Sequence, residues 1–268
     1  MKFFANLLIL SLVAAPVWAE TPHGQHAHPS VVTEKISLVV DANDQFQAGK
    51  NIPLRLTLVA QDGTLLGGED LKEVHTRKFH LLVIDNAMTD YHHLHPVEET
   101  KGRWVVDFTP RKNAPYHLWA DITPATTGQQ QYASFVLGQA LAPEAQTNQH
   151  VVRRNKNGDD VFDLSFDGTP KVGQPLMAHV AVTRHGQPFA QLQPVMGAFA
   201  HMVGFANGGK TVMHVHPMGK EPTLDSERGG PTLVFHLVPL TAGYLKLFAQ
   251  FKIDGKDVFI PFGLQVAE

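Results

Sequence analysis

The stretch YHHLHP, residues 91–96, places three histidines within six residues of a chain that contains 16 histidines in 268. Imidazole is the commonest protein ligand for transition metals and the side chain that titrates nearest to neutral pH. On a β-strand, successive side chains point to opposite faces, so His93 and His95 would project on the same side. Their Cβ atoms would lie about 6 to 7 Å apart. Both rings could then bind a single ion.

The second half of the chain repeats this pattern. FHLLVIDNAMTDYHHLHP (79–96) aligns without a gap with AHMVGFANGGKTVMHVHP (200–217). Three pairs of histidines coincide: His80 with His201, His93 with His214, and His95 with His216. Histidine makes up 16 of 268 residues, about 6%, so three such matches would arise by chance roughly twice in 10,000 trials. The chain therefore carries an internal duplication with one histidine triad in each copy.

Each triad is predicted to converge through a hairpin. The residues between the first and second histidine, IDNAMTD or FANGGKT, include the Asn, Asp and Gly that are typical of hairpin loops. An antiparallel partner strand would bring His80 beside His93 and His95. Three imidazoles with an open fourth position are typical of zinc and copper sites. The alternative is a duplicated hairpin whose histidines have only a structural role.

Methionines around the second triad bear on the choice of metal. Met196 aligns with His75, five residues before the first histidine of each triad, and Met218 follows the second triad. Thioether together with imidazole favours copper, whereas imidazole alone suits zinc equally well. Methionine also fills irregular cores, which is the expected role of Met202 and Met213. The weaker candidates for ligands or ligand-orienting groups are His75, Met196, Met218, Asp121, His23, His26 and His28.

The segments that must position these residues have the patterns of β-strands. IPLRLTLV alternates apolar and polar residues, RWVVDF and TLVFHLV are rich in β-branched and aromatic residues, and Pro or Gly clusters separate them. Several short strands in each half indicate an all-β fold of two tandem immunoglobulin-like β-sandwich domains. The predicted organisation is a signal peptide at 1–19, a histidine-rich flexible segment at 20–35, a first sandwich at 36–138, a linker at 139–160 and a second sandwich at 161–268.

The N-terminus and the composition indicate the compartment. MKFFANLLILSLVAAPVWAE has one lysine, a short apolar run and a small residue before the expected cleavage after Ala19, which predicts export to the periplasm or beyond the cell. No later segment has the ~20 apolar residues of a membrane helix, so we expect no membrane insertion after signal removal. The chain has no cysteine and a formal charge of -3. Nucleic acid is therefore not an expected partner.

The motif resembles a known group of proteins. His80, His93, His95 and Pro96, with Asp121 in YHLWAD, are similar to the H…H-x-H-P signature of exported bacterial proteins with YtkA-like immunoglobulin-type domains. This resemblance implies handling of copper or another heavy metal. In the second half Gln250 replaces Asp121, so the second site is expected to differ if Asp121 orients a ligand.

Three classes of function follow. The first is a non-enzymatic metal-binding protein for copper delivery, buffering or tolerance, with one three-histidine site per domain and an exported or membrane metal-handling protein as partner. The second is a metalloenzyme that uses the open coordination position. Asp85, Asp90 and Glu98 are near the first triad in sequence, but no evident nucleophile or general base accompanies it. The third is a β-sandwich interaction module that binds no metal.

Overall fold

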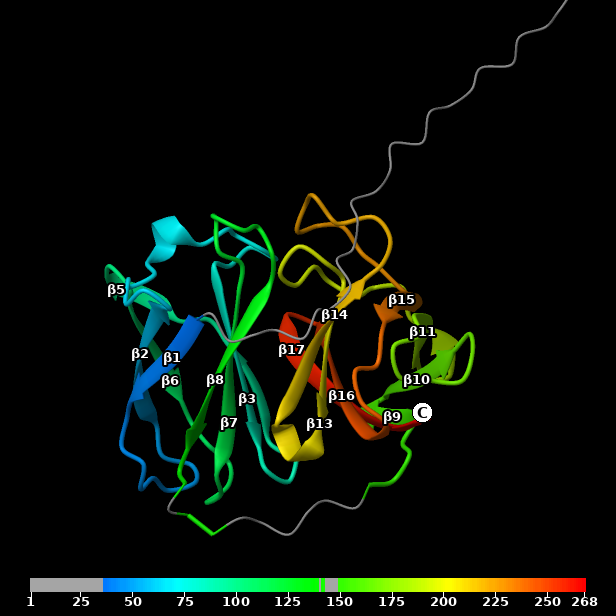
Figure 1. The fold of residues 1–268 in the computed structure, drawn as a ribbon. Helices are drawn as coiled ribbons and strands as arrows, with labels where there is room; N and C mark the ends of the chain where they lie inside the picture. Colours follow the sequence, from blue (N-terminus) through cyan, green and yellow to red (C-terminus); the bar gives the residue numbers. More distant parts are fainter. Residues whose placement is uncertain (1–35, 140, 143–148) are drawn as a thin grey trace, which may run out of the picture. The chain divides into compact units, whose positions relative to one another are not determined.

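The strands of the first domain form two antiparallel sheets that pack face to face (Figure 1, blue to green). The computed structural model describes residues 36–139, 141–142 and 149–268, except for the side chain of His216. One sheet has the order β1 (Ile36–Asp41), β2 (Ile52–Ala60), β6 (Arg103–Phe108), β5 (Val97–Thr100); the other has the order β4 (Tyr91–Leu94), β3 (Phe79–Asp85), β7 (Tyr116–Ile122), β8 (Gln131–Leu137). This is the arrangement of an immunoglobulin sandwich: β1, β2, β6 and β5 take the places of strands A, B, E and D, and β4 is an additional strand beside β3 in the facing sheet.

The second domain repeats this plan with its two layers joined along one edge. Its strands have the order β17 (Lys256–Val266), β16 (Gly243–Ile253), β13 (His201–Ala206), β14 (Thr211–Pro217), β15 (Thr232–Leu237), β11 (Leu176–Arg184), β10 (Asp160–Phe166), β9 (Arg154–Asn157), with β12 (Gln187–Pro188) beside β11. The end of β14 pairs with β15 through His216 and His236, which connects the layers. The prediction of an all-β fold with tandem immunoglobulin-like domains and an internal duplication is confirmed.

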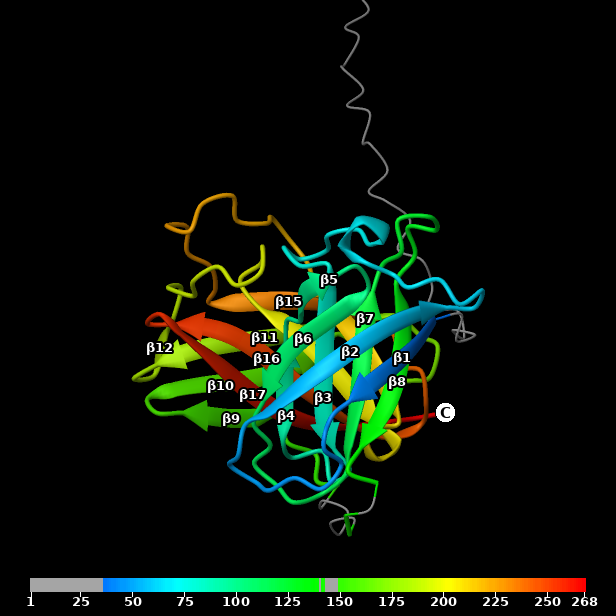
Figure 2. The same ribbon diagram turned by 90° about the vertical axis from the view of Figure 1, so that its left-hand side faces the viewer.

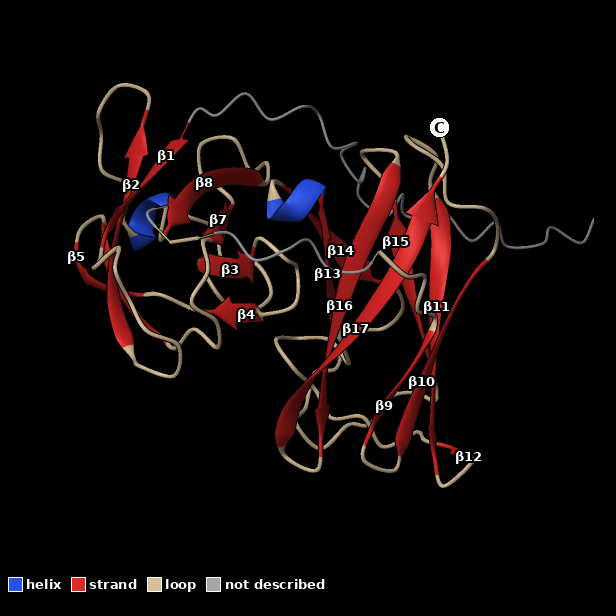
Figure 3. Cartoon of the chain, turned by 90° about the horizontal axis from the view of Figure 1, so that it is seen from below, coloured by secondary structure: helices blue, strands red, loops and turns tan. Residues whose placement is uncertain are grey.

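Regular helix is confined, in the described part of the chain, to two single 3-10 turns, η1 (Gly68–Asp70) and η2 (Asn207–Gly209), drawn in blue in Figure 3. Strand β9 lies inside the predicted linker 139–160. Its sequence RNKN is polar because β9 is an edge strand that presents most of its side chains to solvent, and such a strand has the composition of a loop.

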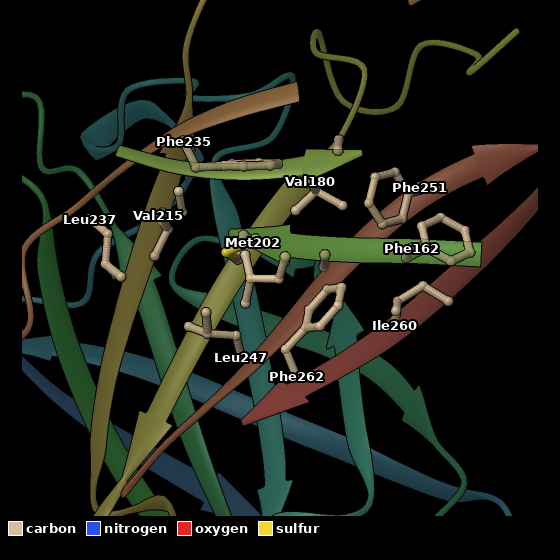
Figure 4. Packing of buried hydrophobic residues seen from close by; sticks show 14 of the residues in the cluster. Phe162, Val180, Met202, Val215, Phe235, Leu237, Leu247, Phe251, Ile260 and Phe262 are labelled. Carbon is tan, nitrogen blue, oxygen red and sulfur yellow. The ribbon is translucent and has the colours of Figure 1, made fainter. Parts of the chain in front are cut away.

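Each domain has its own apolar core. In the first domain the alternating residues of β2, Leu54, Leu56 and Leu58, are almost fully buried against the facing sheet. In the second domain Phe162 and Phe235 from one layer meet Leu247 and Phe262 from the other (Figure 4). The period-2 burial explains why these strands were recognisable from sequence.

A third apolar cluster joins the two domains. Residues Val32–Glu268 form one compact unit, and within it β3 and β13 are buried along their whole length. Leu82 and Ile84 on β3, which alternate with the residues of the first core, pack with Val203 and Phe205 on β13. Seen with the first domain towards the viewer, β3 and β4 lie in front of the strands of the second domain (Figure 2). Both faces of these strands are therefore covered by protein.

The predicted signal peptide and the histidine-rich segment, with His23, His26 and His28, lie outside the described residues. Among residues 36–139, 141–142 and 149–268, no helix has the length and apolar character needed to cross a bilayer.

Candidate metal centre

The first histidine cluster gathers the triad that the sequence predicted for the first domain. His80 is the second residue of β3, His93 is on β4 and His95 follows β4 directly. Leu82 pairs with His93, so the hairpin brings His80 opposite His95. The ring centroids of the three histidines lie 4.8 to 5.2 Å apart. One nitrogen from each ring lies within 4.8 Å of the other two.

The second cluster combines residues of both domains. His201 on β13 and His214 on β14 meet His75, which belongs to the first domain. The ring centroid of His75 lies 4.8 Å from that of His201 and 5.4 Å from that of His214. The sequence grouped His201 and His214 with His216 instead. The backbone of His216 lies on β14, and its side chain is outside the described residues.

A tight turn carries His75 across the domain boundary. Val74 and Arg77 are joined by two backbone hydrogen bonds, Val74 N to Arg77 O at 2.8 Å and the reverse at 3.1 Å. Between them His75 and Thr76 have φ values of 50° and 64°. Side chains other than glycine rarely adopt this left-handed conformation, and such residues concentrate at functional sites. Here the turn presents an imidazole to the other domain.

The two clusters adjoin each other. The ring of His214 lies 6.1 Å from that of His80 and 6.4 Å from that of His93, and the ring of His75 lies 6.4 Å from that of His80. Six imidazoles thus form one continuous patch. It continues the face of β3 and β13 on which the apolar residues join the domains, because His80 and His201 alternate along the strands in step with them.

Hydrogen bonds fix the orientation of the rings in the first cluster. His80 Nε2 lies 2.9 Å from the carbonyl oxygen of Val74. A carbonyl oxygen only accepts, so His80 carries a proton on Nε2, and the neutral ring keeps its lone pair on Nδ1. His93 Nδ1 lies 3.1 Å from Gln250 Oε1 and donates to it, which leaves the lone pair on His93 Nε2. These two lone-pair nitrogens face each other at 3.1 Å.

The rings of the second cluster are held in the same way. His201 Nε2 donates to the carbonyl oxygens of Val195 at 3.0 Å and Met196 at 3.2 Å. Its Nδ1 is buried and, within the described residues, has no hydrogen-bond partner. His214 Nδ1 donates to Asp121 Oδ2 at 2.8 Å, so its lone pair is on Nε2. Such outer hydrogen bonds set the tautomer of a ligating imidazole in metal proteins.

The orienting side chains are exchanged between the domains. His80 pairs with Asp121 on β7, and His201 pairs with Gln250 on β16, so Asp121 and Gln250 occupy equivalent places. Asp121 nevertheless accepts from His214 of the second domain, while Gln250 accepts from His93 of the first. Each domain therefore orients a histidine of the other.

Burial lowers the pKa of three imidazoles of the patch, those of His93, His95 and His201. Desolvation, followed by the neighbouring histidines, holds the pKa of His93 well below its ordinary value. Burial, together with His80 and Arg77, lowers the pKa of His95 to about 4. Burial, with His214 next in importance, lowers the pKa of His201 to about 3. Metals bind the unprotonated ring, so at neutral pH these three histidines are in the ligating form.

The acidic residues near the first triad have structural partners. Asp85 accepts from the backbone N–H groups of Thr89 at 2.6 Å and of Asp90 at 2.7 Å, which closes the β3–β4 loop. Asp90 forms a salt bridge to Arg111 at 2.5 Å. Glu98 accepts from the backbone N–H groups of Gly68 and Gly102, both at 2.9 Å. None of these three carboxylates is therefore placed as a general base for the histidine patch.

The other predicted residues lie in varied settings. His92 faces away from the triad: it contacts Asp90 at 2.8 Å, and its ring lies 5.0 Å from that of Phe108. Met218 is 41% exposed. Met202 is fully buried in the second core, in the space-filling role expected for it. Met196 is half-buried in the turn that corresponds to that of His75.

Comparisons with known proteins place the chain in a family. Residues 32–140 and 156–268 each match the family model described as "Domain of unknown function (DUF8832)". The comparisons therefore show this family, and they give no support for the resemblance to the YtkA-like group. No curated protein matches the sequence.

Similar solved structures share little sequence with the chain. A Salmonella alpha-2-macroglobulin mutant is 13% identical with a TM-score of 0.25, and the match covers 90% of this chain but only 15% of that one. An Escherichia coli alpha-2-macroglobulin activated by trypsin is 11% identical with a TM-score of 0.24, covering 88% and 17%. The D00-D0 domain of intimin is 10% identical with a TM-score of 0.24, covering 87% and 100%. The immunoglobulin-like assignment rests on the strand order itself.

Proposed function

We propose that this chain, which belongs to the DUF8832 family through both of its halves, is a metal-binding protein that handles copper at the histidine patch between its domains. The observation that carries the proposal is the pair of nitrogens, His80 Nδ1 and His93 Nε2, that face each other at 3.1 Å. The outer nitrogen of each ring donates to an oxygen, of Val74 and Gln250 respectively. When both rings are neutral, two lone pairs point at each other, and a cation between or beside them would stabilise this arrangement.

A proton on His93 is a poor candidate for that cation near neutral pH. Burial and four neighbouring histidines lower the pKa of His93 well below its ordinary value. A metal ion fits better, because two nitrogens bound at 2.0 to 2.1 Å to one tetrahedral ion lie about 3.3 Å apart. His95 would supply a third imidazole from the same cluster. The buried, unpartnered Nδ1 of His201 offers a lone pair in the second cluster.

The charge around the patch favours copper as a monovalent ion. The two clusters adjoin, and Asp121 is a carboxylate in hydrogen-bond contact with them. Arg77 adds positive potential at His95. Two divalent ions would bring a charge of about +4 into this buried region, and uncompensated buried charge is costly. Two Cu(I) ions bring half that charge, and imidazole is a suitable ligand for copper. Zinc is the alternative cation.

The cellular role that we propose is delivery, buffering or tolerance of copper in an exported protein. The signal-peptide pattern at 1–19 supports export. The structural roles of Asp85, Asp90 and Glu98 favour a binding protein over a metalloenzyme. A partner that donates or receives the ion would be another exported or membrane protein of metal handling.

Elemental analysis and titration of the full chain with Cu(I), Cu(II) and Zn(II) test the proposal. One variant changes the first cluster (His80→Ala, His93→Ala, His95→Ala) and another changes the second (His75→Ala, His201→Ala, His214→Ala). We expect each to lose about one equivalent of bound Cu(I). The matched control, His179→Ala with His185→Ala, removes two histidines outside the patch and should bind as the wild type does. A wild-type protein that binds no metal would leave the tandem interaction module as its function.

Unchanged stoichiometry in both cluster variants would assign binding to the N-terminal segment. A fourth variant with alanine at His23, His26 and His28 measures that contribution directly.

A further inference from the structure

The two turns that precede the triads are equivalent in structure. Val195 and Ala198 pair across their turn as Val74 and Arg77 do. The carbonyl oxygen of Val195 accepts from His201 Nε2 at 3.0 Å, and that of Val74 accepts from His80 Nε2 at 2.9 Å. At the first turn position, Met196 has a φ of 48° and His75 a φ of 50°. The backbone of Met196 therefore matches that of His75.

The two turns also lie against each other at the domain boundary. A Cβ atom on Gly197 would lie 3.8 Å from Thr76 Cγ2, an ordinary van der Waals distance. His75 leaves its own domain at this point and contacts His201 and His214 of the other. The turn of Met196 has the equivalent backbone conformation on the other side of this boundary.

The exchange of orienting residues shows that the site follows this reciprocity. Asp121 of the first domain accepts from His214, and its counterpart Gln250 of the second domain accepts from His93. Asp121 and His214 thus have Gln250 and His93 as their counterparts in the two domains. By the same equivalence, the counterpart of His75 is Met196, and the counterpart of the second cluster is the first.

We propose that Met196 of the second domain supplies a thioether ligand to the first cluster, so that His80, His93, His95 and Met196 bind one Cu(I) ion together. The inference rests on the proposed metal-binding function and specifies its first site. Sequence alone associates Met196 with the triad of its own half, whereas the reciprocal turns assign it to the triad of the other half.

The two sites then differ in chemistry. Thioether is a soft ligand and, with three imidazoles, favours Cu(I) over Zn(II). The second cluster, with His75 in the equivalent position, presents imidazoles and accepts Cu(II) or Zn(II) as well. Both sites take a ligand from the opposite domain. Binding at either one therefore links the two domains.

The Met196→Leu variant tests this inference, because it removes the sulfur and nearly conserves the side-chain volume. The full chain with one equivalent of Cu(I) is measured by competition with a chromophoric Cu(I) chelator and by X-ray absorption. We expect about tenfold weaker Cu(I) binding or more, with loss of the sulfur scatterer from the first coordination shell. Binding of Zn(II) should change little.

Two further variants complete the design. Met177→Leu removes a half-buried sulfur on β11, outside the clusters, and should behave as the wild type. Met196→His gives the first cluster the ligand type of the second and should raise its affinity for Zn(II) relative to Cu(I).

The outcomes separate this inference from the proposed function. Wild-type affinity and unchanged sulfur scattering in Met196→Leu overturn the role of Met196, and the proposed function still stands if the His80, His93 and His95 triple variant loses one equivalent. If that triple variant binds as much Cu(I) as the wild type, the proposed function itself fails.

Discussion

Gln250 Oε1 accepts a hydrogen bond from His93 Nδ1 at 3.1 Å, although the two residues belong to different domains. The counterpart of this contact, between Asp121 and His214, crosses the boundary in the opposite direction. The two contacts join equivalent positions of the duplicated domains. They differ only in the accepting side chain, which is an amide in Gln250 and a carboxylate in Asp121. The domain interface is therefore part of both candidate sites.

Replacing Gln250 with methionine should weaken the first site without unfolding the protein. Methionine is similar in volume but offers no strong acceptor to His93 Nδ1, so the ring loses the contact that fixes its tautomer. We expect Cu(I) affinity at the first equivalent to fall by about 10- to 100-fold. Chelator competition measures this, with far-ultraviolet circular dichroism as the check on folding. Exposed Gln129, changed to methionine, is the control; equal affinities in both variants would argue against an orienting role for Gln250.

The Asp121→Asn substitution should weaken metal binding at the second site. The amide keeps an acceptor oxygen but loses the charge that supports His214, and Gln130, which donates to both oxygens of Asp121, must rearrange. We expect the second equivalent of metal to bind about 10- to 100-fold more weakly while the first changes less. Stepwise titration resolves the two. An equal loss at both sites would show that Asp121 acts on the patch as a whole. The exposed Asp62→Asn variant provides the comparison.

Metal should stabilise the folded protein, and His75 should carry part of the effect. An ion present at 100 times its dissociation constant adds about 2.7 kcal/mol per site to the free energy of unfolding. For a folded unit of this size, each occupied site therefore raises Tm by roughly 5 to 10 °C. A chelator should reverse the rise, and His75→Ala should halve it because the second cluster loses its link to the first domain. Thermal unfolding with and without Cu(I) measures both, and a full response in His75→Ala would contradict the shared site.

The metal-free protein should lose stability as the pH falls below about 6.5. The pKa of His95, lowered to about 4, and that of His201, lowered to about 3, lie below those of the unfolded chain. The folded state therefore binds fewer protons, so its stability is complete above pH 6.5 and declines towards pH 4. Tm measured against pH after chelator treatment tests this. His95→Gln should flatten the profile, whereas exposed His185→Gln should leave it unchanged; identical profiles for all three proteins would refute the assignment.

Part of this arrangement could be predicted because it depends on local patterns. Alternation of Leu54, Leu56 and Leu58 marks a strand with one buried face, and the loop residues between His80 and His93 mark a hairpin. Within one hairpin, the pleat and the register determine which side chains meet. The first cluster follows from these two facts alone.

The second cluster could not be predicted in this way. His75 meets His201 and His214 only because the outer faces of β3 and β13 pack together, and neither hairpin encodes that contact locally. A signal was present in the sequence: FHLLVID and HMVGFA lack polar alternation, as expected of strands covered on both faces. That signal predicts that another part of the protein covers the second face of each strand, but it does not identify which part.

The amino-acid sequence by itself determined the β-strands, the duplication and the hairpin that gathers His80, His93 and His95, since these depend on side-chain alternation and turn chemistry over short distances. Only the tertiary structure decided that His75, Gln250 and Asp121 each contact histidines of the opposite domain. The physical reason is that burying the second apolar face of β3 against that of β13 sets the orientation of one domain on the other. That orientation places the turns and the orienting side chains across the boundary.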